Sequence, residues 1–193
     1  MISNTPINIV LFGSGAVGKS AMTLRYTCGN FIEDYDPTIE DQYSKDITID
    51  NVTYKCEILD TAGEEEFIQM RLPYIRKGNA FLLVYSITFR PSFDEIEHLH
   101  RDILHNKGTT DVPIVICGNK CDLEELRIVS RSEGEVLAQQ LNCPFMETSA
   151  LTEYNIKNAF QTALREYIKR VTPAQNPAQQ EQQKQKKFRC LLI

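Results

Sequence analysis

Short apolar runs alternate with segments of helical periodicity along most of the chain. Near-continuous apolar runs, typical of parallel strands that are covered on both faces, occupy residues 7–12, 81–87 and 112–117. Apolar residues at helical spacing predict helices over residues 19–28, 92–106, 131–140 and 153–169. Strands that alternate with helices in this way favour an open α/β sheet with helices on both faces.

One region departs from this rule and alternates apolar with polar residues. The alternation covers Ile47 and Ile49 and then Val52 to Ile58, and Asp50-Asn51 between them is typical of a hairpin turn. We therefore expect one antiparallel strand at the edge of an otherwise parallel sheet. Because such sheets bind ligands beyond the carboxyl ends of their strands, we expect functional residues in the loops that follow the strands.

Composition and charge narrow the class of protein. The 193 residues are 42% apolar and 24% charged, which excludes a disordered or fibrous chain. The net charge of -5 argues against a nucleic-acid partner, so we expect none. The six cysteines form no Cys-x-x-Cys pair, no signal peptide is visible, and no apolar run approaches the roughly 18 residues of a membrane span. These features predict a protein of a reducing compartment without a transmembrane helix.

The composition changes after Val171. Pro173 and Pro177 interrupt any helix, and glutamine then dominates without apolar periodicity. We therefore expect a folded domain over residues 1–171 and a flexible, Gln-rich, basic tail over residues 172–193.

The loop after the first apolar run carries a phosphate-binding motif. It reads Gly13-Ser14-Gly15-Ala16-Val17-Gly18-Lys19-Ser20 and matches G-x-x-x-x-G-K-[ST], with a predicted strand before it and a predicted helix after it. Its glycines let backbone N–H groups converge on phosphate oxygens. Lys19 is expected to reach the β- and γ-phosphates, and Ser20 to bind Mg²⁺. The motif predicts a nucleoside triphosphate and leaves the base open.

Two later loops add to this site. Asp60-Thr61-Ala62-Gly63 follows the third predicted strand, where the carboxylate can hold the hydration shell of Mg²⁺ and the glycine lets a backbone N–H approach the γ-phosphate. Asn119-Lys120-Cys121-Asp122 follows a later apolar run. The Asp122 carboxylate can accept two hydrogen bonds from guanine, whereas adenine would leave it unpaired at a cost of several kcal/mol. We therefore expect guanine, and an ATP-using P-loop enzyme is the first alternative.

Together these motifs resemble those of Ras-family small GTPases, over about residues 6–170. Tyr35-Asp36-Pro37-Thr38-Ile39-Glu40-Asp41 is similar to the segment through which Ras proteins bind effectors, and Glu147-Thr148-Ser149-Ala150 is similar to their second guanine-contacting loop. The resemblance implies the G-domain fold of P-loop NTPases, with a six-stranded, mostly parallel sheet. It also implies a molecular switch that binds GTP and GDP with Mg²⁺, hydrolyses GTP slowly, and meets effectors, an exchange factor and a GTPase-activating protein.

The same resemblance assigns roles to single residues. Phe31 would flank the guanine, Thr38 would bind Mg²⁺ and the γ-phosphate as part of switch I, and residues 60–77 would form switch II. The expected nucleotide contacts are Gly13, Ser14, Gly15, Ala16, Val17, Gly18, Lys19, Ser20, Ala21, Phe31, Tyr35, Thr38, Asp60, Gly63, Asn119, Lys120, Asp122, Ser149, Ala150 and Leu151. The residues expected to hold the metal are Ser20, Thr38 and, through water, Asp60. Those expected to carry hydrolysis are Lys19, Thr38, Gly63 and Glu64.

Two positions depart from the Ras pattern. Glu64 stands where Ras proteins usually have glutamine, and Leu151 stands where they usually have lysine. Rap proteins also depart at the first of these positions, so a Ras-like and a Rap-like branch both remain open. A chain in which Glu64 does not position water would be a GTP-loaded binding module without hydrolysis, which is the second alternative.

The last four residues, Cys190-Leu191-Leu192-Ile193, match the C-a-a-X prenylation pattern, and the aliphatic Ile193 favours geranylgeranyl. A single prenyl chain needs a second membrane signal, which nearby basic residues can supply. These residues are Lys184, Lys186, Lys187 and Arg189. We therefore expect lipidation of Cys190 and attachment to an anionic membrane on its cytoplasmic face, with the plasma membrane as the expected location.

Overall fold

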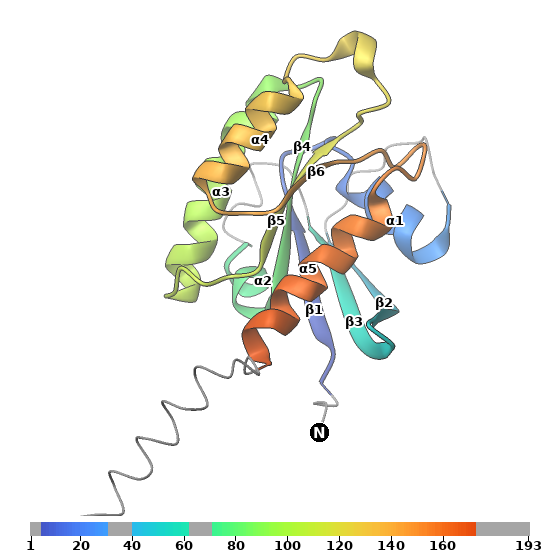
Figure 1. The fold of residues 1–193 in the computed structure, drawn as a ribbon, viewed down its shortest axis with the longest axis vertical. Coiled ribbons are helices and arrows are strands. Elements are labelled where there is room, and N and C mark those ends of the chain that lie inside the picture. The colour runs from blue at the N-terminus through green and yellow to red at the C-terminus, as the bar shows by residue number, and fades with distance from the viewer. Residues whose placement is uncertain (1–4, 31–39, 62–70, 173–193) are drawn as a thin grey trace, which may run out of the picture.

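Six strands form one sheet in the computed structural model, which describes residues 5–30, 40–61 and 71–172 (Figure 1). The strands are β1 (Ile7–Phe12), β2 (Glu40–Ile49), β3 (Val52–Thr61), β4 (Ala80–Ser86), β5 (Ile114–Asn119) and β6 (Phe145–Glu147). Their order in the sheet is β2-β3-β1-β4-β5-β6, and β2 pairs with β3 antiparallel while the other pairs are parallel. The predicted α/β fold with one antiparallel edge strand is therefore confirmed.

Helices cover both faces of the sheet, as predicted (Figure 1). One face is covered by α1 (Lys19–Cys28) and α5 (Ile156–Val171), and the other by α2 (Arg71–Lys77), α3 (Arg90–Lys107) and α4 (Arg131–Gln140). Successive residues of a strand point to opposite faces, so each strand serves both layers. Ile9 and Leu11 of β1 pack toward α1 and α5, whereas Val10 and Phe12 pack toward the other helices. All four are at most 1% exposed, which explains their near-continuous apolar run.

Helix α4 lies close to the sheet because glycines face a large side chain of β4. The Tyr85 hydroxyl would come within 2.7 Å of a Cβ at Gly118 of β5 and within 2.6 Å of a Cβ at Gly134 of α4. Tyr85 is fully buried, and its hydroxyl has no hydrogen-bond partner among the described residues. The two glycines therefore make room for the end of this ring.

Several predicted boundaries were wrong by two or three residues, each for a local reason. The prediction placed a strand over residues 112–117, but β5 begins at Ile114 because Pro113 has no N–H for the ladder. The predicted helix over residues 153–169 begins only at Ile156, since Glu153 and Asn155 have positive φ angles of 64° and 56°. Helix α3 begins two residues before the predicted start, with a proline in its first turn.

Helix α2 and strand β6 have no counterpart among the predicted elements. Helix α2 is short and contains Pro73 near its start, and β6 has only three residues, so neither leaves a clear periodic pattern. A 3₁₀ turn at Glu124–Leu126 was likewise missed.

Within the described ranges, no helix is long and apolar enough to cross a membrane. The cysteines there, which are Cys28, Cys56, Cys117, Cys121 and Cys143, carry free thiols.

Candidate nucleotide-binding site

The predicted motifs meet at one edge of the sheet, where the parallel strands end. The phosphate-binding motif follows β1, Asp60 lies near the end of β3, Asn119 ends β5, and Ser149 follows β6. A direct hydrogen bond joins two of these loops, because the Asn119 side-chain amide donates to the Val17 carbonyl over 2.9 Å. The structure thus brings together residues that lie more than 100 positions apart in the sequence.

The loop from Gly13 to Gly18 turns on residues with positive φ angles. Gly13 has φ 151°, Ala16 has φ 58°, and Gly18, the residue before α1, has φ 96°. A Cβ at Gly13 would overlap the Val84 carbonyl, and one at Gly18 would overlap the Asn119 side chain. Glycine is required at both positions for conformation and for space. The loop leads directly into the N-terminus of α1, whose first N–H groups suit phosphate oxygens.

The Lys19 side chain binds the backbone of this loop from its inner side. Its ammonium donates to the carbonyl oxygens of Gly13 and Ser14 over 2.8 and 2.9 Å. The residue is 6% exposed, and burial lowers its pKa to about 8 while the carboxylates of Asp60 and Glu95 oppose that shift. The charge is therefore held in a fixed place at the centre of the motif.

Asp60 is a buried carboxylate beside the same helix end. It is 1% exposed, and burial raises its pKa to about 6, although the Ser20 hydroxyl and the Lys19 ammonium counteract part of the rise. Neither carboxylate oxygen makes a hydrogen bond of good geometry with a described residue. Buried polar atoms are normally satisfied, so this exception marks a place where a ligand can supply the contacts.

Asn119 and Thr148 form a buried pair on the base side. The Thr148 hydroxyl donates to the Asn119 side-chain oxygen over 3.1 Å, and the two residues are 0% and 1% exposed respectively. The Thr148 backbone accepts from Cys121 N–H and donates to the Gly118 carbonyl. These bonds fix the loop after β5 to the loop after β6.

The loop after β6 is closed by its own hydrogen bonds. Ser149 N–H donates to the Tyr154 carbonyl over 3.0 Å, and the Ser149 hydroxyl accepts from Thr152 N–H over 3.1 Å. Ala150 is 4% exposed, whereas Leu151 is 48% exposed. The loop presents a buried backbone and an exposed apolar side chain at the same edge as Asn119.

Lys120 and Asp122 differ in exposure. Lys120 has a left-handed φ of 65°, and burial lowers its pKa while Asp122 opposes the shift. Asp122 is exposed, which leaves its carboxylate accessible to a ligand.

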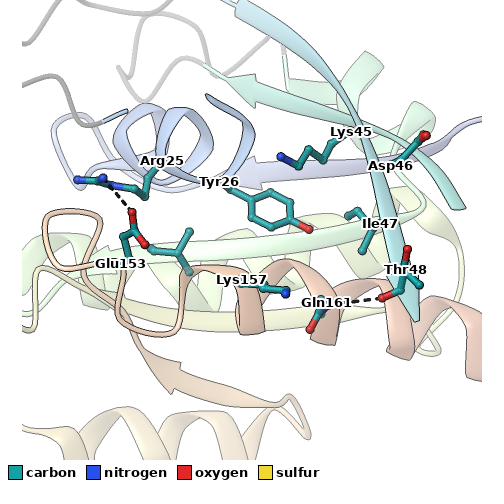
Figure 2. Close-up of a pocket in the computed structure, with 10 residues that line it drawn as sticks. Arg25, Tyr26, Lys45, Asp46, Ile47, Thr48, Glu153, Lys157 and Gln161 are labelled. Atoms are coloured by element: carbon teal, nitrogen blue, oxygen red, sulfur yellow. Dashed lines mark hydrogen bonds and ion pairs between the residues drawn. The ribbon is translucent and has the colours of Figure 1, made fainter. Parts of the chain in front are cut away.

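A hollow of about 430 Å³ lies between α1, β2 and α5 (Figure 2). Figure 2 shows the Arg25–Glu153 ion pair at one end of it, with an N···O distance of 3.0 Å. The predicted nucleotide contacts are absent from its lining among the described residues.

Three residues with structural roles near the site were missed by sequence reasoning. Arg25 bonds the loop after β6, and Glu95 of α3 accepts from the Ser14 hydroxyl over 2.5 Å and from Arg71 over 2.8 Å. Thr148 was seen only as part of a motif. The contacts of Arg25 with the loop after β6 and those of Glu95 span 24 to 126 residues, so no local pattern could reveal them.

Some predicted site residues lie outside the described ranges. These are Phe31, Tyr35, Asp36, Pro37, Thr38, Ile39, Gly63, Glu64 and Cys190. Of the expected effector segment, the structure describes the backbone of Glu40 and the exposed Asp41, both in β2. The roles of all these residues stay predictions.

Comparison with known proteins agrees with the fold and with the arrangement of the motifs. A family model described as "Ras family" matches residues 8–169. The Ras-like protein rasS of Dictyostelium discoideum is 47% identical over 174 residues, which are 90% of this chain and 90% of that protein. The two findings leave the ATP-using alternative without support. The chain belongs to the Ras family of small GTPases, which bind GTP and hydrolyse it.

Proposed function

We propose that the protein is a Mg²⁺-dependent switch that alternates between GTP and GDP and signals through its GTP form. The observation that carries the proposal is the pair of buried charges at the strand ends. Lys19 and Asp60 are 6% and 1% exposed, and the Asp60 oxygens have no good hydrogen bond among the described residues. A buried lysine beside a buried, unsatisfied carboxylate suits a phosphate and a cation bound together.

The phosphate motif and Asp60 fit a magnesium site that the nucleotide completes. Among the described residues there is no group of three His, Cys, Asp or Glu side chains that could hold a metal alone. Magnesium in such proteins is bound by one or two side chains plus substrate phosphates. Ser20, Asp60 through water, and Thr38 would hold it here. Bound there, the metal would supply positive charge that partly neutralises the phosphates.

Guanine specificity is assigned to Asn119, Lys120 and Asp122, with Ser149, Ala150 and Leu151 at the second contact. The exposed Asp122 carboxylate can accept from the N1–H and 2-amino groups. The buried bonds of Asn119 support this assignment because they fix the loop that carries Asp122 relative to the phosphate motif.

Hydrolysis is assigned to Lys19, Thr38, Gly63 and Glu64. Glutamine at the Glu64 position could accept from the attacking water and donate to the phosphoryl group, whereas a carboxylate keeps only the acceptor. We propose that unassisted hydrolysis survives and that stimulation by an activating protein is impaired, because an arginine finger can pair with the carboxylate instead of the phosphate. Changing Glu64 to glutamine then restores stimulation, and changing it to leucine slows the unassisted rate.

The remaining parts of the proposal concern partners and location. Residues Tyr35 to Asp41 and switch II would meet effectors in the GTP form, with an exchange factor and a GTPase-activating protein acting on the same switches. Residues 1–171 form the GTP-binding domain in this proposal, and residues 172–193 a tail that a geranylgeranyl group on Cys190 anchors to the cytoplasmic face of an anionic membrane. A Cys190→Ser variant is then lost from the membrane fraction of cells.

Single-turnover hydrolysis tests the switch directly. Full-length protein is loaded with GTP in chelator, hydrolysis is started with Mg²⁺, and bound GDP is measured over time, with ATP as the comparison nucleotide. We expect slow, Mg²⁺-dependent conversion of GTP and no stable loading with ATP. Conversion at the same rate in chelator, or equal loading with ATP, contradicts the proposal.

A further inference from the structure

Arg25 links helix α1 to the loop after β6 by hydrogen bonds to its backbone. Its Nε donates to the Ala150 carbonyl over 2.9 Å, and its Nη2 donates to the Leu151 carbonyl over 3.1 Å. Its Nη1 donates to the Gly29 carbonyl over 3.1 Å and to Glu153 over 3.0 Å. The planar guanidinium thus spans two consecutive carbonyls of the loop and the end of its own helix.

The burial of the two ion-pair partners separates their roles. The Arg25 side chain is 16% exposed, whereas that of Glu153 is 63% exposed. An ion pair with one exposed partner contributes little. A hydrogen bond from a charged donor to a backbone carbonyl that is partly buried, as that of Ala150 is, contributes more. The bond to Ala150 is therefore the main stabilising contact of Arg25, and the exposed bond to Leu151 adds less.

The Ala150 backbone is held by Arg25 on one side and is unpaired on the other. Ala150 is 4% exposed, and its N–H has no acceptor among the described residues. Buried N–H groups without a partner are rare, so this one is suited to an acceptor on a ligand. The loop bonds of Ser149 fix the adjoining peptide, and Arg25 fixes the following one.

We propose that Arg25 is a positioning residue for the nucleotide base: it holds Ala150 where its backbone N–H meets the O6 oxygen of guanine. The contact between the Ala150 N–H and the base belongs to the proposed guanine site and is what the resemblance to Ras proteins implies. The inference rests on that site and adds Arg25 to it. Helix α1 begins at the phosphate motif and carries Arg25 in its last turn, so about 9 Å of one rigid helix sets the distance between the phosphate contacts and the base contact.

The exposed Leu151 makes this link more important in this chain. A lysine stem at that position would cover the base plane, whereas Leu151 has a shorter side chain that is 48% exposed. With less side-chain cover over the base, the placement of the Ala150 N–H depends more on the backbone, and Arg25 is what fastens that backbone to α1.

The rate of GDP dissociation tests the proposal. Full-length protein is loaded with GDP or with 6-thio-GDP, which keeps the N1–H and 2-amino groups and replaces O6 with sulfur, a weak acceptor. For Arg25→Ala we expect GDP to dissociate about tenfold faster, as for the loss of one charge-assisted hydrogen bond. Dissociation of 6-thio-GDP changes less, because that ligand already lacks the O6 contact. Arg25→Lys, which keeps the charge but not the planar fork, lies between wild type and Arg25→Ala.

Two matched variants distinguish the loss of the Arg25 contacts with the loop from a general loss of contacts at the end of α1. Glu153→Gln removes the ion pair and keeps the carbonyl contacts, and Lys45→Met removes the 3.1 Å bond from Lys45 to the Thr27 carbonyl in the same last turn of α1. Each is expected to change GDP dissociation by less than about twofold.

The outcomes are distinct. Equal acceleration of GDP and 6-thio-GDP in the Arg25 variants, or acceleration matched by Lys45→Met, overturns the proposal. If Arg25→Ala does not fold, Arg25→Lys gives the same comparison. Failure of the wild-type protein to bind GDP at all is a failure of the proposed function instead.

Discussion

The base side and the phosphate side of the site satisfy their polar groups in different ways. On the base side, Asn119 and Thr148 are buried and bonded to each other, and Asn119 also bonds Val17. On the phosphate side, Asp60 is equally buried and its two oxygens have no hydrogen bond of good geometry among the described residues. The Asn119–Thr148 pair of the base side therefore stabilises the fold without a ligand, whereas Asp60 of the phosphate side lowers the stability of the fold until ligands bind.

The largest effect is expected on nucleotide affinity when Asp122, the exposed residue that is proposed to recognise guanine, is changed. Asp122→Asn should lower GTP affinity on the order of 10²-fold or more, because two bonds to a charged acceptor are lost. Preference should shift toward xanthosine triphosphate, whose carbonyl can accept from the new amide. Competition binding with the two nucleotides measures the shift. Retained guanine preference would show that Asp122 does not read the base.

The next effect tests whether the phosphate side costs stability. Asp60→Asn removes a charge that burial disfavours, so the protein in chelator with saturating GDP should become more stable by about 1–3 kcal/mol. Mg²⁺-dependent GTP binding should weaken in the same variant. Denaturant unfolding and Mg²⁺ titration measure the two changes. A loss of stability in chelator contradicts the comparison.

On the base side, removal of a buried polar group is expected to lower the stability of the fold instead of raising it. Thr148→Val keeps the shape of the side chain but removes the donor to Asn119, so the free energy of unfolding should fall by about 1–2 kcal/mol. GDP should also dissociate several-fold faster, since the two loops are no longer joined at that point. Unchanged stability in this variant would mean that the buried bond between Thr148 and Asn119 does not stabilise the fold.

The smallest change in stability is expected at the start of α4. Because this position lies outside both sides of the site, it serves as a reference for the two preceding variants. Glu133 accepts from the Ser130 hydroxyl and backbone N–H and from Arg90, and these bonds lower its pKa from 4.5 to about 2. A lowered carboxyl pKa means stability that is present above pH 4.5 and lost as the pH falls toward 2. Glu133→Gln should therefore be less stable than wild type at pH 7 and equal to it near pH 2. Thermal unfolding across that range is the measurement, and a gap that persists at pH 2 would assign the effect to packing.

The phosphate side was easier to predict from sequence than the contacts that support it. Glycine, lysine and serine at fixed spacing form a phosphate-binding motif that depends only on neighbouring residues. In the structure Gly13 and Gly18 have the positive φ angles that the motif requires, and Lys19 makes its buried contact with the loop backbone. The strand and helix pattern was predicted for the same reason, since periodicity depends on neighbouring residues.

What the sequence left hidden depends on distant partners or on short elements. A basic residue in the last turn of a helix, such as Arg25, is common because it interacts favourably with the helix dipole. Only the fold brings Arg25 to Ala150, which is 125 residues away in the sequence. The late start of α5 follows from left-handed residues that a helical pattern does not exclude. Helix α2 is too short to leave a readable period.

The close fit of Tyr85 against Gly118 and Gly134 has a consequence for how this chain can diverge. A side chain at either glycine position collides with the ring's hydroxyl, at 2.7 and 2.6 Å from the two Cβ positions. A substitution at Gly118 is therefore disfavoured unless Tyr85 shrinks first, whereas one at Gly134 would also have to clear the Phe145 ring, which comes within 2.5 Å of that Cβ. Among descendants of this sequence, Gly118 should change together with Tyr85, and Gly134 only together with both aromatic residues.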